Sequence, residues 1–395
     1  MKTHYYFKLF NSIKEEHEFE FAELELSSLF GEVKRIQNFQ DIIQTTPFKY
    51  FTGGECRIQD ILSYETPYGK WHGFYAERDP EFSCLKHLVN RLAYTREFFV
   101  ITKSKKNVTK ENPVQLFERQ GYFLARFVTN QYFLEKSQYI SKLSRNEQEV
   151  RRNVQQLLEF PLKGLYRIPA SSTMSVGKRL EDYFAIREEP SLYLTHYMHP
   201  YKGKFHPKMV RALLNYVYPK PKGCTMDNFA GCGTLLVEAT VMGLNSIGVE
   251  INPLSSLMSN VKCFSLSLDT EKLKDAINSY LEEVNSALAM YAKQVSGYAL
   301  LFPPKYKIGK LKQEKSEISE KVVKMFREPR MIDEILIAHE ICKHIPDSKI
   351  RNFILLGLSG TISDATRRRS GKFFDMLCDR LKDLYLRLFL FHELN

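Results

Sequence analysis

The sequence predicts an α/β protein in which a small α+β domain precedes a domain built on parallel strands. Residues 1–110 alternate between apolar runs typical of strands and stretches with helical periodicity. A short strand, a glycine-containing turn, a helix and a second strand follow one another within residues 224–252. Beyond residue 269, helical periodicity continues with few interruptions by Gly or Pro.

Composition supports a folded protein with an affinity for polyanions. The chain has 395 residues, enough for two or three domains of roughly 100–200 residues each. Hydrophobic residues make up 44% of it, which excludes wholesale disorder. The formal net charge of +11 is what a protein that binds phosphate backbones would show, although a basic protein without such a partner shows it too.

Cysteine usage and hydropathy indicate a cytoplasmic protein. No apolar run approaches the roughly 18–20 residues needed to cross a bilayer, and we expect no membrane association. The N-terminal residues lack the apolar core of a signal peptide. Seven scattered cysteines form no C-x-x-C pair, so we expect reduced thiols and neither zinc nor disulfides.

The pattern divides the chain into three parts. Residues 1–110 form an α+β domain, with strands expected at 5–10 and 97–101 and a helix at 19–30. Residues 111–190 are expected to be a helical connector, whose charged helix at 145–158 fits either a solvated surface or a nucleic-acid contact. Residues 191–395 form the third part, which is helical toward its C-terminal end.

The stretch at 224–252 has the residues of a nucleotide-binding βαβ unit. Gly231 and Gly233 follow the first strand, where the absence of Cβ atoms lets the backbone approach a ligand. Glu250 closes the second strand 19 residues after Gly231, near the spacing of about 20 at which an acid meets a ribose diol. Because the turn is neither G-x-G-x-x-G nor a P-loop, a nucleotide-like ligand without a pyrophosphate fits best.

Two motifs in this part resemble a known family. The sequence MDNFAGCGTLLVEA, followed by GLNSIGVEINP, resembles the D-P-F-x-G-S-G-T…G-x-D/E-x-N-P motif of S-adenosylmethionine-dependent amino-methyltransferases. These are the DNA N4-cytosine and N6-adenine methylases and their tRNA guanine-N2 relatives. Upstream, THYMHPYKGKFHP (195–207) is similar to the T-H-x-x-H-P-Y-x-G-K-F-x-P signature of the DNA N4-cytosine type.

The resemblance implies a Rossmann-like methyltransferase domain that binds S-adenosylmethionine. Glu250 would bind the ribose and Asn252 would flank the adenine, while Lys204 and Phe205 would lie near the methionine end. The residues implied in the cofactor loop are Asp227, Phe229, Gly231 and Gly233. The chain departs from the motif at Asn228, where the family has Pro, and at Cys232, where it has Ser or Thr. His196, His199 and His206 lie close together in sequence, but no cluster of Cys or acids accompanies them, so we expect no metal.

The N-terminal region has a second resemblance. YYFKLF, HEFEFAELELSSLFG and NRLAYTREFFVI are similar to the start of the tRNA guanine-N2 methyltransferases that carry a THUMP module. This resemblance implies a small ferredoxin-like α+β domain. It makes tRNA the alternative to DNA as the nucleic-acid substrate.

The catalytic motif of this family is not found, and we assign no catalytic residue. Amino-methyltransferases carry [D/N/S]-P-P-[Y/F/W], whose polar groups orient the target amine and whose ring stacks on the flipped base. The one Pro-Pro pair lies in FPPKY (302–306), where Phe302 and Lys305 lack that chemistry; it is either a degenerate motif or a connector. We therefore expect an incomplete methyltransferase domain that acts on DNA amines, alone or as the cofactor-binding part of a split enzyme. The catalytic motif would lie on a second polypeptide or would have been lost by truncation. A non-catalytic nucleic-acid-binding subunit is the remaining alternative.

Overall fold

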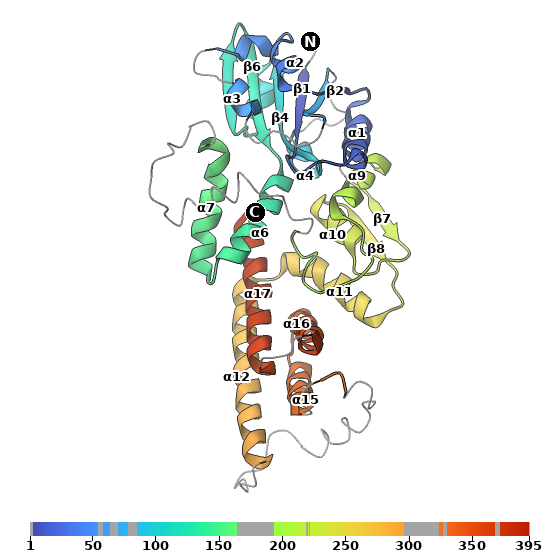
Figure 1. The fold of residues 1–395 in the computed structure, drawn as a ribbon, viewed down its shortest axis with the longest axis vertical. Helices are drawn as coiled ribbons and strands as arrows, with labels where there is room; N and C mark the ends of the chain where they lie inside the picture. Colours follow the sequence, from blue (N-terminus) through green and yellow to red (C-terminus); the bar gives the residue numbers. More distant parts are fainter. Residues whose placement is uncertain are drawn as a thin grey trace.

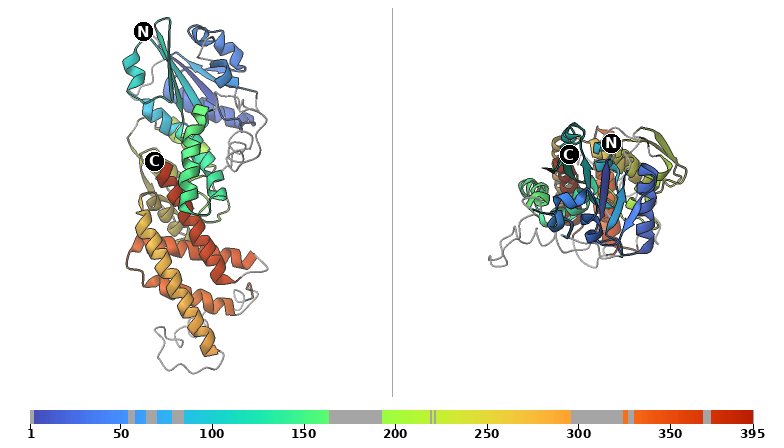
Figure 2. Two further views of the ribbon diagram at one scale, coloured as in Figure 1. Left: turned by 90° about the vertical axis from the view of Figure 1, so that its left-hand side faces the viewer. Right: turned by 90° about the horizontal axis from the view of Figure 1, so that it is seen from above.

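The computed structural model shows an elongated chain with a sheet at one end and helices at the other (Figures 1 and 2). The N-terminal sheet occupies one end, and the long helices of the C-terminal part extend away from it. The residues that the structure describes are 3–53, 58–63, 70–77, 85–163, 193–218, 220, 222–295, 324–326, 330–367 and 372–394.

The N-terminal part is one six-stranded antiparallel sheet with the strand order β2-β3-β1-β4-β6-β5. Its strands are β1 (His4–Leu9), β2 (Lys34–Ile36), β3 (Gly73–Ala76), β4 (Thr95–Thr102), β5 (Gln115–Arg119) and β6 (Tyr122–Val128). The prediction of a helical connector from residue 111 is therefore wrong for residues 115–128. Gln120 and Gly121 both have positive φ, at 49° and 73°, and form the two-residue turn of a hairpin.

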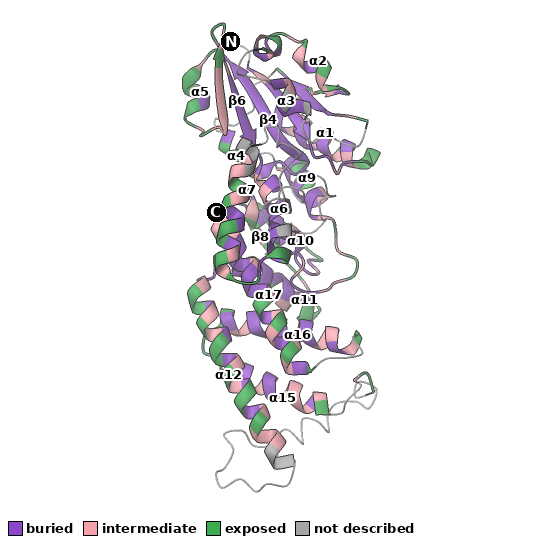
Figure 3. Cartoon of the chain, turned by 60° about the vertical axis from the view of Figure 1, so that its left-hand side comes forward, coloured by how far each residue is buried: buried purple, intermediate pink, exposed green. Residues whose placement is uncertain are grey.

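Helices cover both faces of this sheet. Helix α1 (Glu16–Phe30) packs on the face that carries Phe7 and Phe98, and the opposite face carries Tyr6 and Phe99. The helices that complete this part are α2 (Phe39–Ile43), the 3-10 turn η1 (Phe48–Phe51), α3 (Ile58–Ser63), α4 (Leu85–Arg91) and α5 (Lys105–Thr109). Strands β4 and β6 are largely buried in consequence (Figure 3). Burial on both faces explains why these strands are apolar or aromatic through much of their length.

A buried ionic cluster crosses the centre of the sheet. Lys8 of β1 lies opposite Glu97 of β4, with Nζ 3.3 Å from the carboxylate. Arg126 of β6 lies 2.6 Å from the same carboxylate. Burial raises the pKa of the Glu97 carboxyl, but the charges of Arg126 and Lys8 outweigh that effect and bring it to about 2.

Polar side chains join the N-terminal sheet to the following part. Helix α1 packs against α9 (Pro207–Val217), and the buried Glu25 carboxylate accepts a hydrogen bond of 2.7 Å from the Asn215 amide. Arg91 donates to Asn215 Oδ1 at 2.7 Å and to the carbonyl of Tyr218 at 2.6 Å. These bonds fix α9, and with it the start of the parallel strands, relative to the sheet.

The remaining chain is mainly helical. Its elements after the sheet are α6 (Asn130–Leu143), α7 (Glu147–Lys163), α9, β7 (Cys224–Asp227), α10 (Thr234–Val241), β8 (Asn245–Gly248), α11 (Pro253–Phe264), the 3-10 turn η2 (Ser265–Ser267), α12 (Thr270–Val295), α15 (Arg330–Lys343), α16 (Ser348–Arg367) and α17 (Phe373–Leu394). The described residues contain no strand after β8. The FPPKY segment lies outside the described residues. None of the described helices has the length and apolar character needed to cross a membrane.

We predict that Glu97→Gln destabilises the fold by about 3–5 kcal/mol at pH 7, because it removes the buried carboxylate with which Lys8 and Arg126 form ion pairs. Denaturant unfolding measures this change. The matched control is Glu118→Gln, whose exposed side chain lies 4.0 Å from Lys105 and which should change stability by less than about 0.5 kcal/mol.

The same carboxyl predicts a pH dependence. Because its folded pKa of about 2 lies below the ordinary value of 4.5, its contribution is complete above pH 4.5 and is lost as the pH falls toward 2. Unfolding free energies measured between pH 5 and pH 2 should fall more steeply for the natural chain than for Glu97→Gln. Parallel slopes would contradict the assignment.

Candidate functional site

The predicted βαβ unit is present. Strands β7 and β8 are parallel, with Asp227 opposite Gly248, and α10 connects them. The loop after β7 remains tied to the end of β8, because the Ala230 amide donates to the Val249 carbonyl at 3.0 Å. The carboxyl ends of both strands therefore meet at one edge, which is where ligands bind in open parallel sheets.

Glu250 organises this edge. One oxygen of its carboxylate accepts a 2.7 Å hydrogen bond from the Gly231 amide, and the other accepts a 2.7 Å hydrogen bond from the Asn252 amide. The Asp227 side chain accepts from the Phe229 amide at 3.0 Å in the same loop. Six of the eight sequence-predicted residues, Asp227, Phe229, Gly231, Gly233, Glu250 and Asn252, thus lie in the two connected loops at this edge.

Both glycines of the loop adopt conformations that favour glycine. Gly231 has φ 51° and Gly233 has φ 80°. A Cβ on Gly233 would lie 2.7 Å from the Cβ of Ser259 in α11, so this glycine also permits the close packing of α11 beneath the loop. Asn252 caps α11, because its side chain accepts from the Leu254 amide at 2.9 Å.

The upstream segment at 195–207 packs on the same loop. The hydroxyl oxygen of Tyr201 lies 3.4 Å from the position that a Cβ on Gly231 would occupy. Lys204 turns back on its own segment and donates to the His196 carbonyl at 3.1 Å, and the side chain of Phe205 is exposed. The fold therefore brings together two motifs that are separated by about 20 residues in the sequence.

A buried carboxylate fixes this segment to the helix after the loop. Glu238 of α10 accepts hydrogen bonds from His196 Nε2 at 2.7 Å, Tyr193 Oη at 2.9 Å and Arg211 Nε at 2.6 Å. Burial raises the pKa of the Glu238 carboxyl, but Arg211 and His196 outweigh it and hold the pKa below its ordinary value. Burial also lowers the pKa of His196, so the neutral imidazole donates its Nε2–H to an ionised carboxylate.

Two lysines place positive charge beside the loop. The fully buried Lys262 of α11 donates to the Cys232 carbonyl at 3.1 Å, and burial lowers its pKa. Burial also lowers the pKa of Lys204, and the two ammonium groups are close enough for the charge of Lys204 to lower the pKa of Lys262. Neither lysine forms an ion pair with the described part of the chain.

One side of the site is open. Phe229 is 91% exposed and Ile251 is 97% exposed, although both are large and apolar. Phe229 lies two residues before Gly231, and Ile251 directly follows Glu250. The hydrogen bond between Gly231 and Glu250 holds the loop together. Such exposure of apolar side chains is typical of a binding surface.

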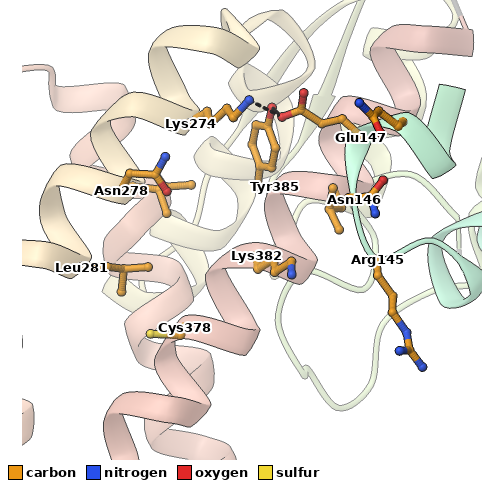
Figure 4. A pocket seen from close by; sticks show the side chains of 12 residues that line it. Arg145, Asn146, Glu147, Lys274, Asn278, Leu281, Cys378, Lys382 and Tyr385 are labelled. Carbon is orange, nitrogen blue, oxygen red and sulfur yellow. Dashed lines mark hydrogen bonds and ion pairs between the residues drawn. The ribbon is translucent and has the colours of Figure 1, made fainter. Parts of the chain in front are cut away.

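The helical part contains a separate cavity. It has a volume of 510 Å³ and lies between α7, α12 and α17. Figure 4 shows Lys274 and Tyr385 both reaching toward Glu147, each at 2.7 Å from its carboxylate. None of the residues predicted for the cofactor lines this cavity. Among the described residues, no three His, Cys, Asp or Glu side chains gather as a metal site would require.

Glu238, Lys262 and Arg211 support the site but were not predicted from the sequence. Glu238 is the single charged residue of α10, and Lys262 is the single charged residue of α11. A single charged residue in a helix without other charges could have indicated Glu238 and Lys262, because a buried charge needs a partner.

Comparison with known proteins places the chain beside methyltransferases. It is 32% identical over 147 residues to the type II methyltransferase M.MjaII of Methanocaldococcus jannaschii, a match covering 33% of this chain and 26% of the relative. It is 26% identical over 204 residues to the type II methyltransferase M.MvaI of Kocuria varians, covering 50% of this chain and 41% of the relative. The chain is thus similar to part of a methyltransferase. No protein-family model and no solved structure matches it.

We predict that Gly233→Ala destabilises the chain more than Gly243→Ala. Both positions have positive φ, at 80° and 73°, but only a Cβ on Gly233 meets another atom within 4 Å. The strained backbone should cost about 1–3 kcal/mol at each site, with the displacement of Ser259 added at Gly233 alone. Thermal unfolding of both variants measures the difference. Equal losses would show that α11 does not pack against the loop as described.

Proposed function

We propose that the loop at β7 and β8 binds S-adenosylmethionine. The residues present fit this cofactor. Glu250 supplies a carboxylate at the end of the second strand for a ribose diol, and Ile251 and Phe229 offer apolar surface for an adenine. Lys204 and Lys262 supply positive charge for the carboxylate of the methionine end. The position of these two lysines beside the glycine loop, with no ion-pair partner among the described residues, is the observation that carries the proposal.

We further propose that the chain takes part in methyl transfer to exocyclic amines of DNA, as an incomplete Rossmann-like domain in the cytoplasm. The partial similarity to type II methyltransferases, the signature at 195–207 and the net charge of +11 support this reading. S-adenosylmethionine supplies an activated methyl group when it is bound. Since the sequence contains no [D/N/S]-P-P-[Y/F/W] motif to orient the amine, we assign that role to a second polypeptide that carries it.

In this proposal the residues of the chain hold and orient the cofactor. Glu250 keeps the two loops at a fixed separation through the amides of Gly231 and Asn252. The Glu238 network keeps the segment at 195–207 against the loop, so that Lys204 and Tyr201 stay in place. Preorganisation of this kind removes the cost of ordering the loops on binding.

We predict that the purified chain binds S-adenosylmethionine but does not label nucleic acid on its own. The test offers radiolabelled cofactor with duplex DNA and unmodified tRNA, and measures cofactor binding in the same preparation. Labelled DNA would place a complete catalytic unit in this chain, and labelled tRNA would replace the DNA proposal by the tRNA alternative. The absence of cofactor binding would contradict the proposed function.

We predict that Lys204→Met weakens binding of S-adenosylhomocysteine without affecting 5′-methylthioadenosine, which lacks the carboxylate. A lost hydrogen bond to a charged group is worth about 1.5–3 kcal/mol, or roughly a 10- to 150-fold rise in Kd. Calorimetric titration of both ligands measures it. Lys202→Met, a change to an exposed lysine two residues away, is the control. An equal rise in Kd for both ligands would show that Lys204 does not bind the carboxylate of the methionine end.

A further inference from the structure

One face of the parallel sheet is uncovered. Met226 of β7 pairs with Ile247 of β8, and Val249 follows on the same side, because side chains alternate along a strand. Their side chains are 59%, 54% and 49% exposed. The opposite face is closed by α10, since a Cβ on Gly248 would lie 2.6 Å from Leu236. Three adjacent apolar side chains thus form an exposed patch on the sheet itself.

The edges of this sheet are also open. Among the described residues, β7 pairs only with β8, and β8 pairs only with β7. The two strands lie at the margin of the molecule (Figures 1 and 2). Parallel sheets occur almost only with both faces covered, and two strands alone are marginally stable. We therefore expect another strand to pair with the exposed edge of this sheet, and another element to cover its exposed apolar face.

We propose that this surface, formed by Met226, Ile247, Val249 and the edge of β7 that pairs with no described strand, is the binding site of the second polypeptide. The partner adds a parallel strand to the edge of β7 and covers the apolar face with a helix. The proposal rests on the proposed function for the identity of the partner. The interface itself follows from the exposed face and edges.

The position of the glycine loop selects the edge of β7. In open parallel sheets, ligands bind where the strand order reverses, between two strands whose connections run in opposite directions. The connection from β7 through α10 runs toward β8. A partner strand on the other side of β7 would make β7 the point of reversal, and the loop from Asp227 to Gly233 would then lie between the two halves.

Two observations define the chemistry of the partner. The matches cover only 26% and 41% of the two relatives, so most of each relative has no counterpart in the alignment with this chain. Lys220 and Lys222, both exposed, lie just before β7, so acidic residues on the partner would complement this end of the sheet. The partner we propose is therefore a polypeptide that supplies a parallel strand, a covering helix and an acidic rim. It would also cover Phe229 and Ile251 on the open side of the site.

Site-specific cross-linking tests the proposal without reference to activity. A photo-reactive amino acid is placed at Met226, or at Leu158 of α7 as the control, in a tagged chain made in the cells that naturally produce it. We expect the Met226 position to cross-link to a polypeptide with a Pro-Pro-aromatic motif, and the Leu158 position to give no such product. A product with a second copy of this chain, a cross-link within the chain, or no product at Met226 would each overturn the proposal.

A pair of variants separates binding from folding. Ile247→Asp should leave the unfolding temperature of the isolated chain within about 2 °C, because the side chain is already half exposed, and should reduce recovery of the partner at least tenfold. Leu158→Asp, at a position 40% exposed, should leave recovery unchanged. Equal recovery with both variants would overturn the proposal. Cofactor binding by the isolated chain is measured separately, so a failure of the proposed function is distinguishable from a failure of this interface.

Discussion

The buried carboxylate of Glu238 is the interaction on which the candidate site depends. It accepts hydrogen bonds from His196 and Tyr193 in the upstream segment and from Arg211 in α9. Removing one partner of such a buried cluster leaves a charge without compensation, which is far more costly than losing a surface contact. Through α10, which Gly233 caps, this cluster determines where the loop after β7 lies relative to the segment at 195–207.

A second polar cluster transmits that arrangement to the N-terminal sheet. Glu25, Asn215 and Arg91 fix α9 against α1 and α4, and α9 carries Arg211 to the Glu238 cluster. Lys262 supports the loop from the side of α11. Two sets of buried hydrogen bonds, both involving α9, thus connect the N-terminal sheet with the loop. The βαβ unit is held by these contacts on one side and is exposed on the other.

The sequence predicted the elements whose signals are local. The strand-turn-helix-strand order at 224–252 follows from apolar runs separated by glycines, and the structure has it. Residues 115–128 were predicted as helix, although Gln120-Gly121 between two runs with aromatic residues is a hairpin signal. Pairing of Lys8 with Glu97 and of Glu238 with Arg211 joins residues that are distant in sequence, so no local pattern could show it.

The central claim is that a preformed half of a cofactor site exists at the ends of β7 and β8. Amide chemical-shift mapping of the isolated chain during titration with S-adenosylhomocysteine tests this claim most directly. We expect the amides of Gly231, Gly233, Glu250 and Asn252 to shift together in a saturable way, with those of the N-terminal sheet unchanged. Saturable shifts confined to the cavity between α7, α12 and α17, or no shifts at millimolar ligand, would contradict it.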